Sequence, residues 1–201
     1  MSRLTRRGFV RRSVTGLGVV AAGASARTSA GAGSPAEKVV LALIGAGGRG
    51  RGLIKQVAAR KDCHVKYICD LEQKRGEGSA REVEQGEGSA PKIVREMRTV
   101  FDDKDVDGVI VATPEQWHGL ATVRACQAGK DVYVEKCICR KVEEGRKMVQ
   151  AAQKYKRIVQ AGTQSRATAY AASARKYIEE GNLGEVFLVK AFFMQSGVYG
   201  G

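Results

Sequence analysis

The chain has 201 residues, of which 43% are hydrophobic and 27% charged, a balance typical of a globular protein with a sizeable core. Its formal net charge is +13, but residues 1–26 hold five arginines and no acid, so the charge falls to +8 without them. The remaining basic residues are interleaved with glutamates, as in residues 72–85, and form no stripe with stacking aromatics. This pattern argues against a nucleic-acid partner.

The first 26 residues resemble an export signal. Residues 5–10 (TRRGFV) carry an arginine pair followed by an apolar pair, as in the twin-arginine motif, and residues 24–26 (ASA) resemble a small-residue cleavage site. A disordered basic tail is the alternative interpretation. We expect residues 1–26 to be a signal peptide for the twin-arginine export machinery and residues 27–36 to be a flexible linker. The protein is then expected to be periplasmic or secreted.

A glycine motif follows the first predicted strand. The apolar run 39–44 leads into Gly45-x-Gly47-x-x-Gly50, and residues 50–60 then carry apolar residues at helical spacing. In a dinucleotide-binding fold, the first glycine makes a tight turn and the second lets the backbone approach a diphosphate. The third lets the helix and strand pack closely. A flexible surface loop is the alternative, since glycine is abundant in this chain.

The second predicted strand, at residues 64–69, ends in an acidic residue. Asp70 lies 20 residues after Gly50, where a carboxylate can accept hydrogen bonds from the adenosine ribose hydroxyls of a dinucleotide. A carboxylate at this point repels a 2′-phosphate, so the sequence favours NAD over NADP. Lys74 and Arg75 follow closely and could offset that repulsion, although a solvated helix face is their simpler interpretation.

Strands and helices alternate through the rest of the chain up to residue 162. After a helix at 72–85, the pattern predicts strands at 96–101, 107–113, 131–135 and 157–162 and helices at 117–128 and 142–155. Such alternation means parallel pairing with right-handed crossovers. We therefore predict an α/β fold, a doubly wound parallel sheet of the Rossmann type, over residues 37–162.

Some finer features can also be predicted. Val142, Gly145, Val149 and Ala152 are expected to line one face of the helix at 142–155. The direct repeat GEGSA at 76–80 and 86–90 is interpreted as a loosened helix end and loop. Among the cysteines, Cys69 and Cys126 are expected to be small core residues. Cys137 and Cys139 have no matching ligand cluster, so no metal site is expected.

The carboxyl ends of the predicted strands carry the remaining polar residues of interest. Ligands of doubly wound sheets bind at this edge. Thr113 and Pro114 follow one strand, with Trp117 and His118 just beyond, and Glu135 and Lys136 follow the next. Residues 160–164 and Arg166 accompany the last. Each segment could be an ordinary loop, and their convergence on one edge is what favours a site.

Taken together, these motifs resemble the Gfo/Idh/MocA family of NAD(P)-dependent oxidoreductases. GAGGRG, the CD pair at 69–70, ATPEQWH, AGKDVYVEK and IVQAGTQSR occur in the expected order, and the resemblance covers residues 37–195. It implies a Rossmann domain followed by a C-terminal α/β domain with an open, mostly antiparallel sheet. It also implies a sugar or polyol substrate. A homo-oligomer is implied only where that second domain is complete.

The resemblance also assigns roles to residues. Gly45, Gly47 and Gly50 would hold the diphosphate, and Asp70 would hold the adenosine ribose. Thr113, Pro114 and His118 would line the nicotinamide side, with Glu135 also in the coenzyme site. Lys136 would contact the reacting hydroxyl, so Lys136 and His118 are the catalytic candidates. A fixed ammonium can stabilise a developing alkoxide. The simpler interpretations are a surface lysine and a histidine packed on Trp117.

The chain departs from the family pattern at two points. Cys137 stands where the family motif has proline, so the backbone after Lys136 is expected to be less fixed and to lack the cis bond that proline favours. Residues 163–201 are expected to start a truncated second domain, with a helix at 167–180, a turn, and a first strand at 185–194. The substrate residues of that domain would then be missing, and turnover by this chain alone is expected to be very low.

Three functions therefore remain open at the level of sequence. The first is hydride transfer between NAD(P) and a sugar-like alcohol. The second is a dinucleotide-binding module without chemistry of its own. The third is an NAD-dependent glycosidase, because some exported members of the resembling family use bound NAD for transient oxidation during glycoside cleavage.

Overall fold

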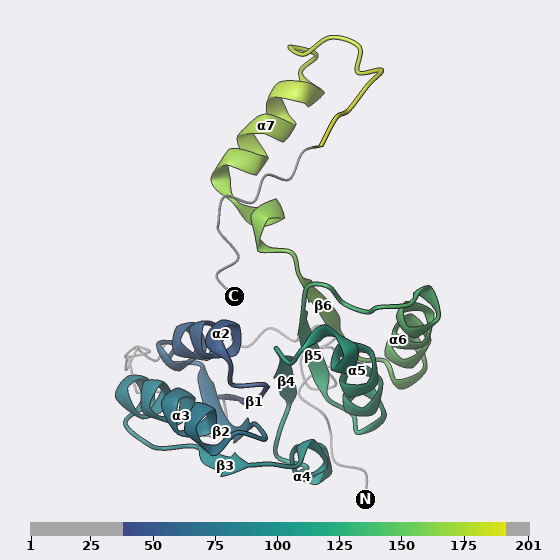
Figure 1. Ribbon diagram of the computed structural model, residues 1–201. Helices are drawn as coiled ribbons and strands as arrows, with labels where there is room; N and C mark the ends of the chain where they lie inside the picture. The colour runs from purple at the N-terminus through teal and green to yellow at the C-terminus, as the bar shows by residue number, and fades with distance from the viewer. Residues whose placement is uncertain (1–37, 192–201) are drawn as a thin grey trace, which may run out of the picture. The chain divides into compact units, whose positions relative to one another are not determined.

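The computed structural model describes residues 38–191, and its centre is one parallel sheet (Figure 1). Its six strands are β1 (Val39–Ile44), β2 (Cys63–Cys69), β3 (Lys92–Val94), β4 (Gly108–Val111), β5 (Asp131–Glu135) and β6 (Val159–Gly162). They lie in the order β3-β2-β1-β4-β5-β6, and every neighbouring pair is parallel. This confirms the predicted α/β doubly wound sheet. The predicted signal peptide and linker lie outside the described residues.

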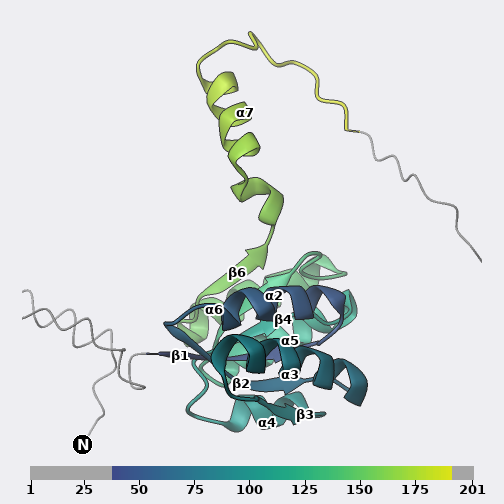
Figure 2. The ribbon, with the colours of Figure 1, turned by 90° about the vertical axis from the view of Figure 1, so that its left-hand side faces the viewer.

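Helices cover both faces of the sheet (Figures 1 and 2). They are α2 (Gly48–Ala58), α3 (Gln73–Glu87), α4 (Met97–Asp102), α5 (His118–Gln127) and α6 (Val142–Tyr155). One apolar cluster joins Leu43 and Ile68 of the sheet to Ile54 of α2 and Val83 of α3. A second cluster joins the other sheet face to α4, α5 and α6. Because strands buried on both faces need apolar side chains in both directions, the sequence runs VVLALI and GVIV are continuous rather than alternating.

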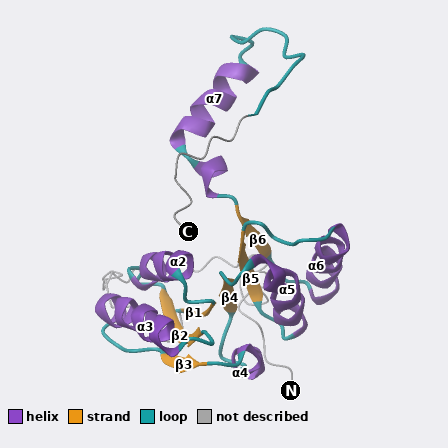
Figure 3. Cartoon of the chain, in the orientation of Figure 1, coloured by secondary structure: helices purple, strands orange, loops and turns teal. Residues whose placement is uncertain are grey.

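The short strand predicted at residues 96–101 is wrong. The strand lies earlier, at β3, and α4 occupies the predicted range (Figure 3). Glu96 explains the boundary, because its side chain accepts a hydrogen bond from the backbone N–H of Arg98 and so caps the start of the helix. The first GEGSA copy lies inside α3 and the second spans its end, where Gly88 adopts a left-handed conformation with φ of 78°.

The predicted apolar face of α6 is right only in part, since Gly145 and Ala152 are half-buried. Val142 is 67% exposed and Val149 is 56% exposed, whereas Met148 and Ala151 are buried. The helix turns this side inward because it packs beside α5, where a Cβ on Gly119 would lie 3.3 Å from the Cβ of Glu144. Cys69 and Cys126 are buried, as predicted for core residues. Cys137 is exposed, and no group of three or more metal-ligand side chains occurs among the described residues.

The segment after the sheet contains a short 3-10 helix, η3 (Gln164–Ala167), and α7 (Ala169–Glu179). This confirms a helix close to the predicted range 167–180. The strand predicted at 185–194 is absent from residues 185–191, and its last residues lie outside the described part of the chain. A strand needs a hydrogen-bonded neighbour, and no described strand runs beside this segment. Within residues 38–191, no helix has the length and apolar character needed to cross a membrane.

Candidate functional site

Two glycines of the loop between β1 and α2 are required by the packing of the protein itself. Gly45 has φ of 93°, and a Cβ there would lie 2.6 Å from the backbone nitrogen of Thr113. A Cβ on Gly50 would lie 2.0 Å from the carbonyl oxygen of Gly45. Only glycine allows the turn and the close packing of α2 against the end of β1. These contacts fix the position of the helix start at the carboxyl edge of the sheet.

The two glycines between them are not required by packing. Gly47 has φ of −66° and ψ of 179°, a conformation that any residue adopts. Beyond its chain neighbours, a Cβ on Gly47 would come no closer than 3.9 Å to another residue, at Arg75 Nη1. One on Gly48 would meet nothing within 4 Å outside its neighbours and the nearby backbone of α2. No side chain caps α2, and the first turn of a helix offers unpaired N–H groups and a positive dipole end. The open space therefore fits an anionic group such as a diphosphate.

Asp70 is held against the glycine loop. Its Oδ2 accepts a hydrogen bond from the backbone N–H of Ala46 at 2.7 Å, and its Oδ1 accepts one from the N–H of Glu72 at 2.9 Å. Each carboxylate oxygen keeps a further lone pair for a ligand hydroxyl. A cavity of about 970 Å³ runs from Asp70 to Thr113 and Pro114 and is also lined by Trp117. The structure therefore places these predicted coenzyme residues around one space.

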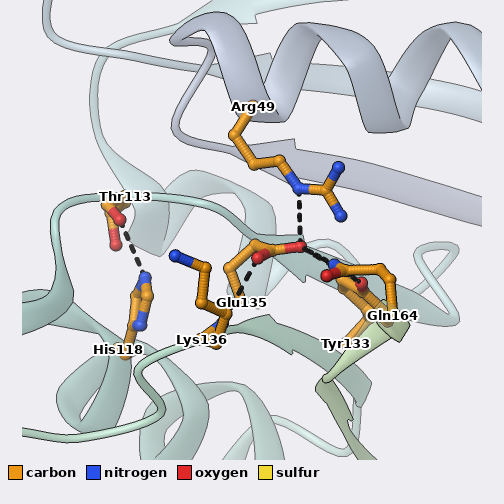
Figure 4. Close-up of polar contacts among 7 residues, drawn as sticks. All are labelled: Arg49, Thr113, His118, Tyr133, Glu135, Lys136 and Gln164. Atoms are coloured by element: carbon orange, nitrogen blue, oxygen red, sulfur yellow. Dashed lines mark hydrogen bonds and ion pairs between the residues drawn. The ribbon is translucent and has the colours of Figure 1, made fainter. Parts of the chain in front are cut away.

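Thr113 lies at the far side of that space, and His118 contacts the carbonyl oxygen of Thr113. The Oγ1 atom of Thr113 is buried and has no hydrogen-bond partner among the described residues, so a ligand group there could satisfy it. The His118 ring is also buried, with Nε2 2.8 Å from the carbonyl oxygen of Thr113 (Figure 4). Its Nδ1 lies 2.6 Å from the carbonyl oxygen of Cys137. His118 therefore joins the end of β4 to the backbone after Lys136. The peptide bond between Lys136 and Cys137 is cis, which corrects the expectation that cysteine would give a trans bond.

Glu135 ends β5 and is the most heavily bonded side chain of the site. Its carboxylate is 5% exposed and accepts hydrogen bonds from Arg49 Nε at 2.8 Å, from the Tyr133 hydroxyl at 3.1 Å, and from Gln164 Nε2. Burial alone would raise the pKa of Glu135. The hydrogen bond and the charge of Arg49, together with Tyr133, outweigh burial and lower that pKa below its ordinary value.

Lys136 follows Glu135 and is exposed. Figure 4 shows its side chain between the pair Thr113–His118 and Glu135. It forms no ion pair with a carboxylate of the described residues. The ammonium group is therefore available to a ligand at the carboxyl ends of β4 and β5.

Two residues of this network were not predicted as site residues. Arg49 lies within the glycine motif, and its first-turn position on α2 is the signal that could have found it. Tyr133 lies two residues before Glu135 on β5, and side chains two apart on a strand share a face. That spacing could have placed the Tyr133 hydroxyl beside the Glu135 carboxylate.

The comparison with protein families decides the membership of the chain. Residues 39–163 match the model of an oxidoreductase family with an NAD-binding Rossmann fold, GFO_IDH_MocA. The chain belongs to the Gfo/Idh/MocA family. Residues 39–163 are therefore an NAD-binding Rossmann domain, and the predicted family resemblance is confirmed for this part.

Relatives of this Gfo/Idh/MocA chain include dehydrogenases and glycosidases. It is 32% identical over 100 residues to levoglucosan dehydrogenase from Pseudarthrobacter phenanthrenivorans, covering 50% of this chain and 26% of that protein. It is 36% identical over 104 residues to a glycosyl hydrolase family 109 protein from Stenotrophomonas maltophilia, covering 49% and 23%. The chain thus spans about a quarter of the length of these relatives.

Solved structures show the same fold. A putative myo-inositol dehydrogenase from Sinorhizobium meliloti superposes with a TM-score of 0.62 at 26% identity, covering 74% of this chain and 43% of that one. Scyllo-inositol dehydrogenase from Lactobacillus casei, solved with bound NAD(H) and scyllo-inositol, gives a TM-score of 0.66 at 18% identity, with the same two coverages. The second likeness is evidence of the fold alone.

Proposed function

We propose that this chain binds NAD along the carboxyl edge of its sheet and contributes the coenzyme half of an oxidoreductase that acts on a sugar or polyol hydroxyl. The observation that carries the proposal is the open space over Gly47 and Gly48. Neither glycine is required by backbone conformation or by packing, yet both lie at the start of α2 beside Asp70. A ligand diphosphate explains why this space is kept open.

NAD rather than NADP is the proposed coenzyme. The Asp70 carboxylate lies where the adenosine ribose would bind, and its negative charge disfavours a 2′-phosphate. Of the two cations that closely follow Asp70, Lys74 and Arg75, Arg75 lines the cavity. Its Nε lies 2.6 Å from a carboxylate oxygen of Glu72, so its charge is already compensated. The second part of the proposal therefore predicts a lower affinity for NADPH than for NADH.

Lys136 is the proposed catalytic residue, with His118 supporting it. Bound NAD would supply a hydride acceptor close to Lys136. The hydroxyl proton would leave to solvent and the hydride on the same carbon would pass to NAD. The Lys136 ammonium would donate a hydrogen bond to the substrate oxygen and stabilise the negative charge that develops there as the proton leaves. His118 contacts the carbonyl oxygen of Cys137, and so it would hold the backbone that carries Lys136.

Fluorescence titration tests coenzyme binding. Trp117 is the one tryptophan of the sequence, is 44% exposed and lines the cavity, so its emission should transfer to the nicotinamide of bound NADH. We expect saturable quenching by NADH and weaker quenching by NADPH. Absence of binding at millimolar NADH would refute the proposal. Lys136→Met should leave NADH binding intact while abolishing any NADH formation from NAD and a sugar or polyol.

An NAD-dependent glycosidase is a second candidate, supported by the glycosyl hydrolase family 109 relative at 36% identity. Release of nitrophenol from aryl glycosides, without net NADH formation, would favour it over the dehydrogenase. A third candidate, a dinucleotide-binding module without chemistry, predicts NADH binding with neither reaction.

We also propose that residues 1–26 direct export by the twin-arginine route, giving a periplasmic or secreted protein. The support is the arginine pair at 6–7 with the apolar stretch and the ASA sequence that follow. Cell fractionation tests this proposal. Replacing both Arg6 and Arg7 with lysine should retain the protein in the cytoplasm, whereas replacing Arg11 and Arg12 should not.

A further inference from the structure

The ion pair between Arg49 and Glu135 crosses the proposed coenzyme site (Figure 4). Arg49 lies in the first turn of α2, directly after β1, whereas Glu135 ends β5. β1 and β4 are neighbours in the sheet, and the chain order reverses between them. Ligands of doubly wound sheets bind in the crevice at this reversal. The pair therefore bridges the two halves of the sheet over that crevice.

Arg49 and Glu135 differ in how many other hydrogen bonds each side chain makes. Glu135 is buried and keeps hydrogen bonds from the Tyr133 hydroxyl, from Gln164 and from the backbone N–H of Lys136 if Arg49 leaves. The Arg49 side chain is 47% exposed, and it donates to Glu135 through Nε alone. The Arg49 guanidinium can therefore move while the Glu135 carboxylate keeps its other hydrogen bonds. The guanidinium also carries further N–H donors that can bind another acceptor.

An anion at the start of α2 would compete for Arg49. Arg49 directly follows Gly47 and Gly48, whose open space fits a diphosphate. A diphosphate carries more negative charge than one carboxylate, and guanidinium groups bind phosphate oxygens through paired hydrogen bonds. An anion bound above these glycines would therefore lie one to two residues along the chain from Arg49, whose side chain now holds Glu135.

We propose that Arg49 exchanges partners when the coenzyme binds, leaving Glu135 and binding the coenzyme diphosphate. Glu135 then acts as a competitor that lowers diphosphate affinity in the free protein, and Arg49 is a further coenzyme-binding residue. This inference rests on the proposed function, because it needs the diphosphate above Gly47 and Gly48.

Binding of ADP, measured by calorimetry on the full chain, tests the exchange. ADP carries the diphosphate but no nicotinamide ribose, so direct contacts of Glu135 with that ribose do not enter. We expect Arg49→Gln to weaken ADP binding by about tenfold and Arg49→Lys to weaken it less. Glu135→Gln should tighten ADP binding about threefold. This gain should vanish in the Arg49→Gln background, because there is then no guanidinium for Glu135 to hold away from ADP.

Arg51→Gln is the matched control. Arg51 is half-exposed on the same helix and pairs with Glu82, so its loss removes the same charge from the same helix end. It should change ADP affinity by less than about twofold. Adenosine, which lacks phosphate, should bind all variants equally.

The outcomes separate this inference from the function on which it rests. If the unaltered chain binds neither NADH nor ADP, the proposed function and the exchange both fail. If it binds NADH and Arg49→Gln leaves ADP affinity unchanged, only the exchange fails. If Glu135→Gln weakens ADP binding in both backgrounds, Glu135 is a ligand rather than a competitor, and the exchange fails as well. The Arg49 variants alter a half-exposed side chain, so they decide the matter even if Glu135→Gln does not fold.

Discussion

The two edges of the candidate site are built in different ways. The loop edge, Gly45–Gly50 with Asp70, is held by backbone contacts and by carboxylate bonds to nearby N–H groups. The strand-end edge, formed by Thr113, His118, Glu135 and Lys136, is held by side chains that reach between distant segments, as from Arg49 to Glu135 and from His118 to Cys137. The loop edge therefore requires a particular residue type, such as glycine, at fixed positions. The strand-end edge requires particular pairs of residues that bond to one another. Variants should damage the two edges in different ways.

The largest expected effect is loss of stability at the loop edge. Gly50→Ala places a Cβ 2.0 Å from the carbonyl oxygen of Gly45, so the helix start must move. We expect a loss of about 3 kcal/mol or more in the free energy of unfolding, measured with denaturant. Gly52→Ala is the control, because its Cβ meets nothing within 4 Å and alanine favours a helix by about 0.5–1 kcal/mol. Equal stabilities for the two variants would contradict this account of the loop.

At the strand-end edge, His118→Leu should cost about 2 kcal/mol, because it removes a buried hydrogen-bonding ring from two backbone carbonyl oxygens. His118→Gln keeps one donor and should recover part of the loss. Denaturant unfolding of both variants measures this effect. A leucine variant as stable as the original chain would mean that His118 does not hold the segment after Lys136.

This contrast also explains which parts of the fold and of the site could be predicted from the sequence. The alternation of apolar runs and helical patterns predicts the sheet, since strands buried on both faces leave little freedom in residue choice. The glycine spacing and Asp70 predict the loop edge for the same reason. The pairing of Arg49 with Glu135 joins residues 86 apart, and such a contact depends on how helices and strands assemble. The inward face of α6 depends on α5 in the same way. The spacing of apolar residues within α6 alone therefore did not identify the buried residues.

Sequence could not separate the roles of the glycines either. Gly47 and Gly50 belong to the same motif, yet only Gly50 is required by packing. Gly47→Val should therefore leave the free energy of unfolding nearly unchanged while lowering NADH affinity at least tenfold, or about 1.4 kcal/mol. Trp117 fluorescence and denaturant unfolding on the same sample measure both quantities. Loss of stability without loss of affinity would reverse the roles assigned to the two glycines.

The smallest expected effect is a pH dependence at the strand-end edge. The pKa of Glu135 is lowered below its ordinary value in the folded chain, since Arg49 and Tyr133 outweigh the effect of burial. A carboxyl with a lowered pKa adds stability that is present above its unfolded pKa and is lost as pH falls through the folded pKa. The original chain should therefore exceed Glu135→Gln in free energy of unfolding by more at pH 7 than at pH 3.5. Arg49→Gln removes the main cause of the lowered pKa, so in that background the advantage of Glu135 over glutamine should depend less on pH. A pH dependence that persists undiminished there would show that Arg49 does not stabilise the ionised carboxylate, and the bridge between the two edges would lose its energetic basis.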